Sequence, residues 1–332
     1  MASIVQKRVF TRKLSLSSVA SRICNSGVDC SMHDLKLSSF RRSGRFYCSS
    51  NALKYVFLLP AALWIVAFTI FPFLSTIHYS FGNYVLGRGI TGYVGLENYL
   101  NVLRSGAFWY SMFITSVYVS LAVPLELALG FLLACFVILC PPEHNFFRPI
   151  LTAPLFTMEV AIGYLGITLF TSQGGLFAEV LDYLGVHIPW MTTAYGGLAA
   201  AIILDVWRWT PFVFLIAIAG LSAIPDEMYE AALLETSNYR HLMFYIALPL
   251  SWPVLSVALL LRLIEALKTF GIPLALTGGG PGISTQLFSI LNYYTTIQFF
   301  DFGKGSAMAV VYLVFVSVAV ALFFNRIRRG FE

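Results

Sequence analysis

The stretch YVFLLPAALWIVAFTIFPFL, residues 55–74, carries no charged side chain and decides the fold class of the chain. An α-helix needs about 20 mainly apolar residues to cross the hydrocarbon core of a bilayer. Six stretches meet this length, and they run over Tyr55–Phe81, Tyr110–Leu139, Phe147–Phe170, Gly196–Ala223, Phe244–Leu276 and Ser306–Phe324. The sequence therefore predicts an all-α membrane protein with six transmembrane helices.

The overall composition excludes a soluble protein of this length. Hydrophobic residues make up 58 % of the 332 residues and charged residues only 11 %, with a mean hydropathy of +0.78. Because soluble domains carry roughly 25 % charged residues, this chain needs membrane lipid around it. The net charge of +5 does not indicate a nucleic-acid partner, since the cations gather near the two ends of the chain.

The distribution of Lys and Arg between the loops predicts the orientation. Ten cations precede Tyr55, and together with Arg148, Arg240 and three near the C-terminus they place 15 in the predicted cytoplasmic segments. The predicted outer loops hold Arg88 and Arg104, with Lys304 at a boundary. Since positive charge favours the cytoplasmic side, we expect a multi-pass protein of the plasma (inner) membrane with both termini in the cytoplasm.

Three segments of the chain differ in composition. Residues 1–54 are rich in Ser, Lys and Arg and contain only two acidic residues, Asp29 and Asp34. We expect a disordered basic tail that fixes the orientation, although the same composition is typical of an organellar transit peptide or belongs to an upstream extension before Met32. Residues 55–325 form the predicted transmembrane domain, and residues 326–332 form a basic cytoplasmic tail.

Motifs for catalysis and cofactor binding are absent from the sequence. The nucleotide-binding pattern GxxxxGK[ST] does not occur, nor do HExxH and GxSxG. The five cysteines form no CxxC and no Cys–His arrangement with metal-ligand spacing. We therefore expect no catalytic residue, no metal site and no cofactor in this chain.

The connection between the fourth and fifth stretches is the most informative loop. Residues 224–253 read IPDEMYEAALLETSNYRHLMFYIALPLSWP. Pro225 and Asp226 favour the start of a helix, and Glu227 and Glu230 suit its first turns. The charge of this loop is mostly acidic, although positive charge is expected on the cytoplasmic side. We therefore expect an amphipathic helix that docks another protein.

This loop resembles the Glu-Ala-Ala loop of ABC importer permeases. The family pattern is Glu-Ala-Ala, three residues, Gly, about nine residues and Ile-x-Leu-Pro, and this sequence has Thr236 in place of the Gly. The resemblance implies a short coupling helix that seats in an ATPase subunit, and two such ATP-binding subunits use the ATP. The residues it assigns to this contact are Glu230, Ala231, Ala232, Glu235, Thr236 and Pro249.

A second stretch resembles the sugar-type permeases of the first-subunit kind within this family. Residues 276–285 read LTGGGPGIST, and Phe270-Gly271 stands where the family usually has Phe-Asp. The resemblance implies transport of a sugar or related polyol, a second homologous permease subunit and an extracytoplasmic substrate-binding protein. On the outer face, Gly278, Gly279 and Gly280 are expected to shape a substrate route or to meet the binding protein.

Charged residues inside the predicted spans mark structural pairs or functional groups. The set comprises Glu126, Glu159, Asp205, Arg208, Arg262, Glu265 and Lys268. Asp205 and Arg208 are three residues apart, as are Arg262 and Glu265, so each pair can form on one helix face. Two interpretations stay open for these four residues: structural ion pairs or a lining of the substrate path.

Two rival functions remain at the level of sequence. An ion-gradient-driven secondary transporter would use Asp205 and Glu265 as relay groups and would need no partner subunit. A membrane enzyme would need a cluster of His or Cys on the spans, which the sequence lacks. Loss of transport on substitution of Glu230 separates the importer from both, since neither rival docks an ATPase there.

Overall fold

The computed structural model describes residues 50–85, 87, 89–139, 147–171, 174–185, 188–235 and 238–329. Residues 1–49 of the predicted tail, Thr236 of the predicted coupling segment and residues 330–332 lie outside this description. The chain divides into two units, Met1–Val66 and Ala67–Glu332. The first unit contains α2, and the second contains the elements from α3 onward together with the functional residues discussed below.

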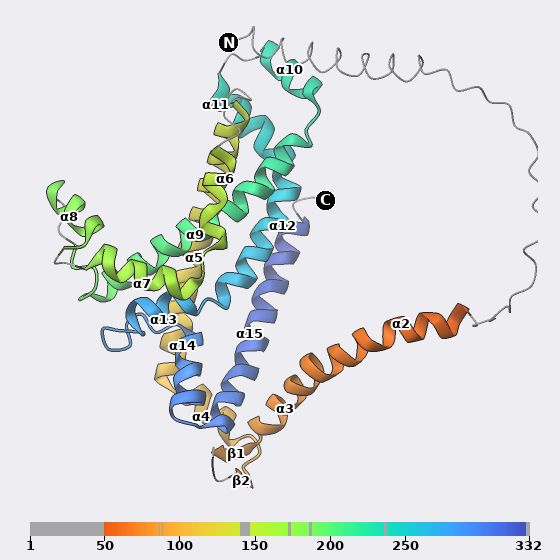
Figure 1. The fold of residues 1–332 in the computed structure, drawn as a ribbon, viewed down its shortest axis with the longest axis vertical. Coiled ribbons are helices and arrows are strands. Elements are labelled where there is room, and N and C mark those ends of the chain that lie inside the picture. The colour runs from red at the N-terminus through yellow and green to blue at the C-terminus, as the bar shows by residue number, and fades with distance from the viewer. Residues whose placement is uncertain are drawn as a thin grey trace, which may run out of the picture. The chain divides into compact units, whose positions relative to one another are not determined.

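The described residues are almost entirely helical, with one small hairpin (Figure 1). In chain order the elements are α2 (Ser50–Ile65), η1 (Val66–Ile70), α3 (Phe71–Ser80), β1 (Gly82–Val85), β2 (Gly89–Tyr93), α4 (Glu97–Arg104), α5 (Gly106–Leu139), α6 (Phe147–Thr152), η3 (Ala153–Phe156), α7 (Glu159–Phe170), α8 (Leu176–Tyr183), α9 (Ala194–Ser222), α10 (Asp226–Glu235), α11 (Tyr239–His241), η4 (Leu242–Ala247), α12 (Leu248–Leu267), α13 (Gly271–Thr277), α14 (Phe288–Tyr293), η5 (Tyr294–Gln298) and α15 (Phe302–Arg329).

Within the described residues, five helical runs are long and apolar enough to cross a membrane. They are Phe57–Ser80, Gly106–Ile138, Ala194–Ser222, Leu242–Leu267 and Phe302–Arg326. A sixth span results if the bent pair Arg148–Phe156 and Glu159–Phe170 is taken as one crossing. The predicted fold class, an all-α membrane protein, is confirmed.

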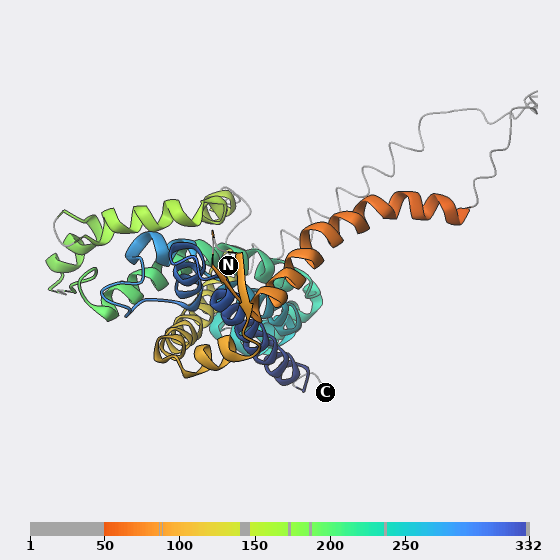
Figure 2. The same cartoon turned by 90° about the horizontal axis from the view of Figure 1, so that it is seen from below.

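The third predicted span is not a straight helix. Its two halves meet at an angle of 101°, and α7 runs across the direction of the long helices in both Figure 1 and Figure 2. Thr157 and Met158 adopt extended backbone conformations, with ψ of 141° and 136°. An extended residue cannot continue the hydrogen-bonding pattern of an α-helix, so the chain turns at this point.

The fifth predicted span, Phe244–Leu276, is wrong at its C-terminal end. The long helix α12 ends at Leu267, and α13 begins after a break at Thr269 and Phe270. The backbone leaves the helical region at Phe270, with φ of −140°, and Pro273 follows in the first turn of α13. Pro273 alone does not force this break, because four other prolines of the described residues stand inside continuous helices. Near the start of α13 the same proline is tolerated, since the N–H groups of a first helical turn have no partner within the helix.

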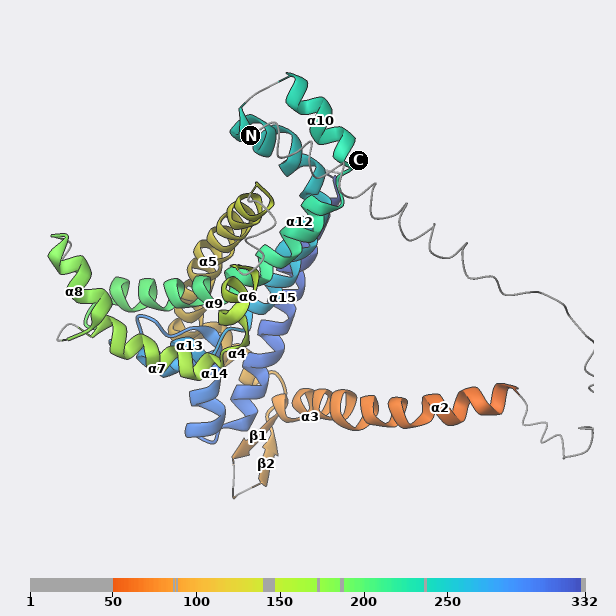
Figure 3. The same cartoon turned by 45° about the horizontal axis from the view of Figure 1, so that its top comes forward.

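The polar connections contain more structure than the sequence predicted. The hairpin β1–β2 is antiparallel, with Gly82 opposite Tyr93 and Tyr84 opposite Ile90. It lies at the opposite end of the second unit from α10 and α11, as Figures 1 and 3 show. Asn98 of α4 fixes the start of the hairpin by donating to the carbonyl of Gly82 at 3.0 Å.

The core of the second unit forms where α5, α9 and α12 pack together, with α7 and α13 against α9. Small residues allow this close approach. A Cβ at Gly130 of α5 would lie 2.7 Å from the Cβ of Val213 of α9, which is closer than side chains tolerate. Gly130 stands one helical turn after Glu126, so the contact that it permits brings this carboxylate close to α9.

Candidate functional site

Three side chains from three helices form a buried ion cluster. Glu126 of α5, Asp205 of α9 and Arg262 of α12 have side chains that are 0 %, 1 % and 1 % exposed. Arg262 Nε donates to Glu126 Oε2 at 2.5 Å and Nη2 donates to Oε1 at 2.8 Å, while Nη2 also pairs with Asp205 Oδ2. Bidentate pairing of this kind is strong and directional. We call Glu126, Asp205 and Arg262 the buried triad.

An aromatic ring borders the buried triad. The indole of Trp209 has the guanidinium carbon of Arg262 4.8 Å from its centroid and that of Arg208 4.9 Å away. Asp205 and Trp209 are four residues apart on α9, so both face Arg262. Since the guanidinium of Arg262 is desolvated, its cation–π contact contributes about 2 kcal/mol.

One donor of the triad is unsatisfied. Nη1 of Arg262 is buried and makes no hydrogen bond to any described residue. Leaving a buried donor unpaired costs about 1–3 kcal/mol, and more for a charged group. Buried charges in a membrane protein mark functional positions. A cationic donor without a partner suits the oxygen of a hydroxylated solute, and the ring of Trp209 lies beside it.

A second polar cluster holds the bend between η3 and α7 against α9. Arg208 Nη1 pairs with Glu159 Oε1 at 3.0 Å, and Arg208 Nε donates to the carbonyl of Thr157 at 3.2 Å. The other carboxylate oxygen of Glu159 accepts from the backbone N–H of Gly271 at 3.2 Å. Glycine is required there, because a Cβ would lie 2.6 Å from the Cβ of Glu159. We call Arg208, Glu159 and Gly271 the bend clasp.

The charge pairs predicted within single helices are wrong. Arg208 pairs with a carboxylate of α7 instead of Asp205, and Arg262 pairs with carboxylates of α5 and α9 instead of Glu265. Glu265 instead bonds to Lys268 at 2.8 Å, and both side chains are about half exposed. The reason is orientation: Arg262 lies on the buried face of α12, whereas Glu265 lies on its exposed face. The structure therefore separates Glu265 from the triad.

The glycine-rich loop after α13 is closed by its own hydrogen bonds. Gly278 and Gly279 have φ of 59° and 92°, a region that side chains disfavour. Tyr294 donates to the carbonyl of Gly278 at 2.7 Å, and Thr285 donates to that of Gly280 at 2.8 Å. These bonds hold the loop in one defined conformation.

The glycine loop also packs against the beginning of α9. A Cβ at Gly197 would lie 3.2 Å from the methyl groups of Thr277 and Thr285. Asp205 stands eight residues further along α9, which corresponds to about 12 Å of helix. Gly278, Gly279 and Gly280 therefore lie away from the buried triad, although both are attached to the same helix.

The predicted coupling segment forms the helix α10. Ala232 is buried and packs with the apolar cluster at the C-terminal end of α9 and the beginning of α12, while Tyr229 donates to the carbonyl of Leu221 at 3.1 Å. Glu230 and Ala231 are exposed, and Leu234 is 90 % exposed. The helix thus has one face bound to the protein and one free face that carries an acidic and an apolar side chain. Pro249 is exposed near the start of α12.

Sequence reasoning missed part of this site. Trp209 was not identified, although its position four residues after Asp205 is a signal for a shared face. Glu126 and Glu159 were recognised as charges inside spans, but their partners lie 136 and 49 residues away and follow no local spacing. Within the described residues, no group of three or more His, Cys, Asp and Glu could hold a metal ion.

Comparison with known proteins agrees with this architecture. Residues 103–331 match the family described as binding-protein-dependent transport system inner membrane component. The trehalose/maltose transport system permease protein MalF of Thermococcus litoralis is 37 % identical over 267 residues, which cover 80 % of this chain and 90 % of that protein. The sulfoquinovosyl glycerol transport system permease protein SmoG of Agrobacterium fabrum is 31 % identical, over 83 % and 90 % of the two chains.

A solved structure shows the same fold. It is a bacterial ABC transporter involved in the import of the acidic polysaccharide alginate, with a TM-score of 0.74 at 20 % identity over 83 % of this chain and 95 % of that chain. Together these comparisons support an importer permease and speak against the ion-gradient-driven alternative. The chain belongs to the family of binding-protein-dependent transport system inner membrane components, the permease subunits of ABC importers.

Proposed function

We propose that this chain is the transmembrane permease subunit through which an ATP-driven importer moves a sugar or related polyol. The observation that carries the proposal is the free face of α10, with Glu230, Ala231 and Leu234 exposed on a helix whose other face is packed. The names of the relatives, which include trehalose, maltose and sulfoquinovosyl glycerol transport, support the solute class.

The free face of α10 suits an ATPase subunit. Ala231 allows close backbone approach because its side chain is a single methyl group, and Leu234 offers an apolar contact. Glu230 adds a charge that an arginine of the partner can bind. Glu235, Thr236 and Pro249 complete the proposed contact by resemblance to the family. ATP is bound and hydrolysed by the ATPases, so this chain needs no cofactor of its own.

The position of α10 in the chain explains how docking would reach the solute. It connects α9, which carries Asp205 and Trp209, to the helical run that continues into α12, which carries Arg262. A movement of α10 therefore acts on both helices that border the unsatisfied donor. Because the buried triad ties α5, α9 and α12 together, these helices would move as one body against α7, and the bend clasp is the polar contact between them.

The solute site would lie at Arg262 Nη1 and the ring of Trp209. Asp205 and Arg208 border this position. With Arg262, three of the four charged residues predicted for the substrate path therefore belong to the proposed site. Glu265 is on the exposed face and is not part of the proposed site. Gly278, Gly279 and Gly280 would shape the route at the beginning of α9, about two helical turns from the triad.

The remaining partners follow from the family. A second homologous permease subunit would complete the pathway, with two ATP-binding subunits at the α10 end. An extracytoplasmic substrate-binding protein would deliver the solute at the opposite end, where the hairpin β1–β2 lies. Both chain termini would then be on the cytoplasmic side with α10.

Co-purification with a matched charge reversal tests the proposal. The chain carries a C-terminal tag, is expressed with its native neighbouring genes, and is reconstituted in liposomes for uptake of radiolabelled trehalose and maltose with and without ATP. We expect an ATPase and a second permease to co-purify, and Glu230→Lys to remove the ATPase. Glu179→Lys on α8 makes the same charge change at another exposed position and should retain it.

Two results would contradict the proposal. Retention of the ATPase and of full ATP-driven uptake in Glu230→Lys would exclude α10 as the docking surface. The second result is uptake by the isolated chain without ATP that stops when an ion gradient is dissipated. It would show that the chain is an ion-gradient-driven secondary transporter.

A further inference from the structure

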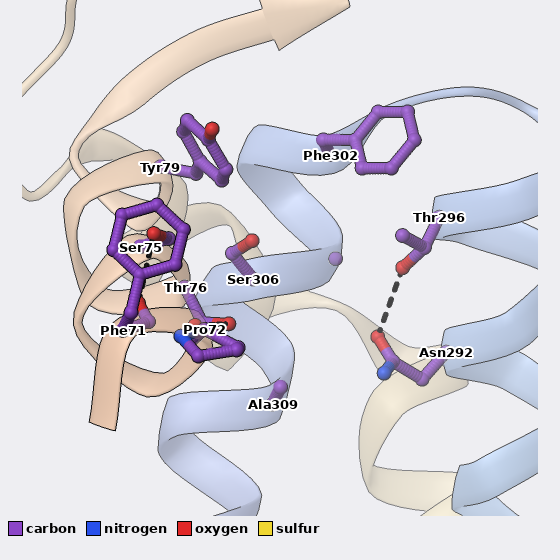
Figure 4. A pocket seen from close by; sticks show the side chains of 11 residues that line it. Phe71, Pro72, Ser75, Thr76, Tyr79, Asn292, Thr296, Phe302, Ser306 and Ala309 are labelled. Carbon is purple, nitrogen blue, oxygen red and sulfur yellow. Dashed lines mark hydrogen bonds between the residues drawn. The ribbon is translucent and has the colours of Figure 1, made fainter. Parts of the chain in front are cut away.

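A pocket outside the buried triad opens between α3, the α14–η5 segment and α15 (Figure 4). It has a volume of about 450 Å³, within the range of about 300–1,000 Å³ that small-molecule pockets occupy. Its lining shares no residue with the triad or the bend clasp, and it comprises Phe71, Pro72, Ser75, Thr76, Tyr79, Asn292, Thr296, Phe302, Gly305, Ser306 and Ala309.

The polar groups of this pocket are neutral. Ser75, Thr76, Asn292, Thr296 and Ser306 line it, and none of the lining side chains is charged. A pocket without a charged group offers nothing to balance an ionic ligand, since burying an unpaired charge is unfavourable. The lining therefore selects uncharged ligands with hydrogen-bonding groups.

Some of these polar groups have free hydrogen-bonding capacity. Ser75 and Thr76 donate to carbonyls of their own helix at 2.8 and 2.9 Å, which leaves their oxygens able to accept. Asn292 Oδ1 accepts from Thr296 at 3.4 Å, as Figure 4 shows. Among the described residues, the amide nitrogen of Asn292 and the hydroxyl of Ser306 have no partner. Donors and acceptors thus face the pocket from two sides.

Aromatic rings close one end of the pocket. Tyr79 and Phe302 both line it, and Tyr84 of β1 contacts each of them, with ring centroids 4.9 Å from Tyr79 and 5.6 Å from Phe302. The contact fixes both rings, so they offer a rigid apolar surface at low entropic loss. Neutral hydroxyls and amides beside fixed aromatic rings match a molecule with hydroxyls on its rim and C–H groups on its face.

We propose that this pocket is a second solute site, which binds a neutral sugar ring or polyol apart from the buried triad. The choice of a sugar or polyol as ligand rests on the proposed function, and the neutral polar lining of the pocket supports the same choice independently. An acyl chain of a lipid would leave the amide nitrogen of Asn292 and the hydroxyl of Ser306 without partners, and a phosphorylated or acidic sugar would find no cation.

Protection of an introduced cysteine tests this site without ATP or transport. Ser75→Cys lines the pocket, while Phe73→Cys stands on the same helix, is 48 % exposed and does not line it. The full chain with its co-purifying subunits is placed in lipid nanodiscs and treated with N-ethylmaleimide. Peptide mass spectrometry then reads the modification rate at each position, so the native cysteines are retained. Glucose, trehalose and sorbitol are the neutral probes, and glucuronate is the acidic comparator.

We expect at least one neutral probe to slow modification at position 75, by ~10-fold when its concentration is ten times the Kd, and to leave position 73 unchanged. Glucuronate should protect less, and adding Asn292→Leu or Ser306→Ala should reduce protection. Absence of protection by all three neutral probes, equal protection at position 73, or a thiol at position 75 that reacts only after lipid is stripped would each overturn the site. Because no ATP is present, these outcomes are independent of whether Glu230→Lys releases an ATPase.

Discussion

Arg262 of α12 donates to both carboxylate oxygens of Glu126 of α5, at 2.5 and 2.8 Å, although 136 residues separate them in the sequence. The same guanidinium holds Asp205 of α9, so one side chain ties three long helices together. Breaking a buried pair leaves uncompensated charge and is strongly destabilising, whereas exposed pairs contribute little. This contrast can be tested with Arg262 inside α12 and Lys268 at its C-terminal cap.

Removal of the Arg262 charge should destabilise the protein far more than removal of a nearby exposed charge. Arg262→Met leaves two buried carboxylates without a cation, and we expect a loss of about 3–5 kcal/mol. Lys268→Met breaks the exposed pair with Glu265 and should lose no more than about 1 kcal/mol. Thermal unfolding of both variants in detergent measures the difference, and similar melting temperatures would contradict the structural role of the triad.

Adjacent alanines of α10 should separate folding from docking. Ala232 is 5 % exposed, so Ala232→Glu buries a charge and should lower the melting temperature. Ala231 is exposed, so Ala231→Glu should leave the melting temperature near that of the unmodified chain while the ATPase no longer co-purifies. The same effect of both substitutions on both measurements would show that α10 has no free docking face.

A methyl group at Gly271 should disturb the bend clasp. Its Cβ would lie 2.6 Å from the Cβ of Glu159 and 2.9 Å from the carboxylate oxygen, and such overpacking costs about 1–3 kcal/mol. Gly106→Ala at the start of α5 is the matched control, because a Cβ there has no neighbour within 4 Å. We expect Gly271→Ala alone to lower the melting temperature and the rate of uptake. An unchanged Gly271→Ala would show that α7 and α13 separate freely.

The glycine loop should accept only residues that adopt positive φ. Gly278 has φ of 59°, a conformation that Asn tolerates and β-branched residues do not. Gly278→Asn should therefore retain most of the stability and transport, whereas Gly278→Val should lose about 1–2 kcal/mol. Melting temperature and trehalose uptake check both variants, and equal behaviour of Asn and Val would contradict a fixed loop conformation.

Local patterns in the sequence sufficed for much of the fold. The apolar stretches located the long helices, because their length and lack of charge depend on no distant residue. The start of α10 at Asp226 agrees with the prediction from Pro225 and Asp226. The break before α13 was not predicted. Pro273 near the end of the predicted fifth span is not a sufficient signal for it, because other prolines of the described residues stand inside continuous helices.

The sequence by itself determined that this chain is a helical membrane protein with a helix between its fourth and fifth apolar stretches, since composition and spacing are properties of the chain alone. Only the tertiary structure decided which carboxylate each arginine binds. A spacing of three residues places a possible partner on the same helix. A buried guanidinium, however, needs carboxylates that are buried beside it. Those groups come from neighbouring helices, and their choice depends on how closely residues such as Gly130 and Gly271 let the helices approach.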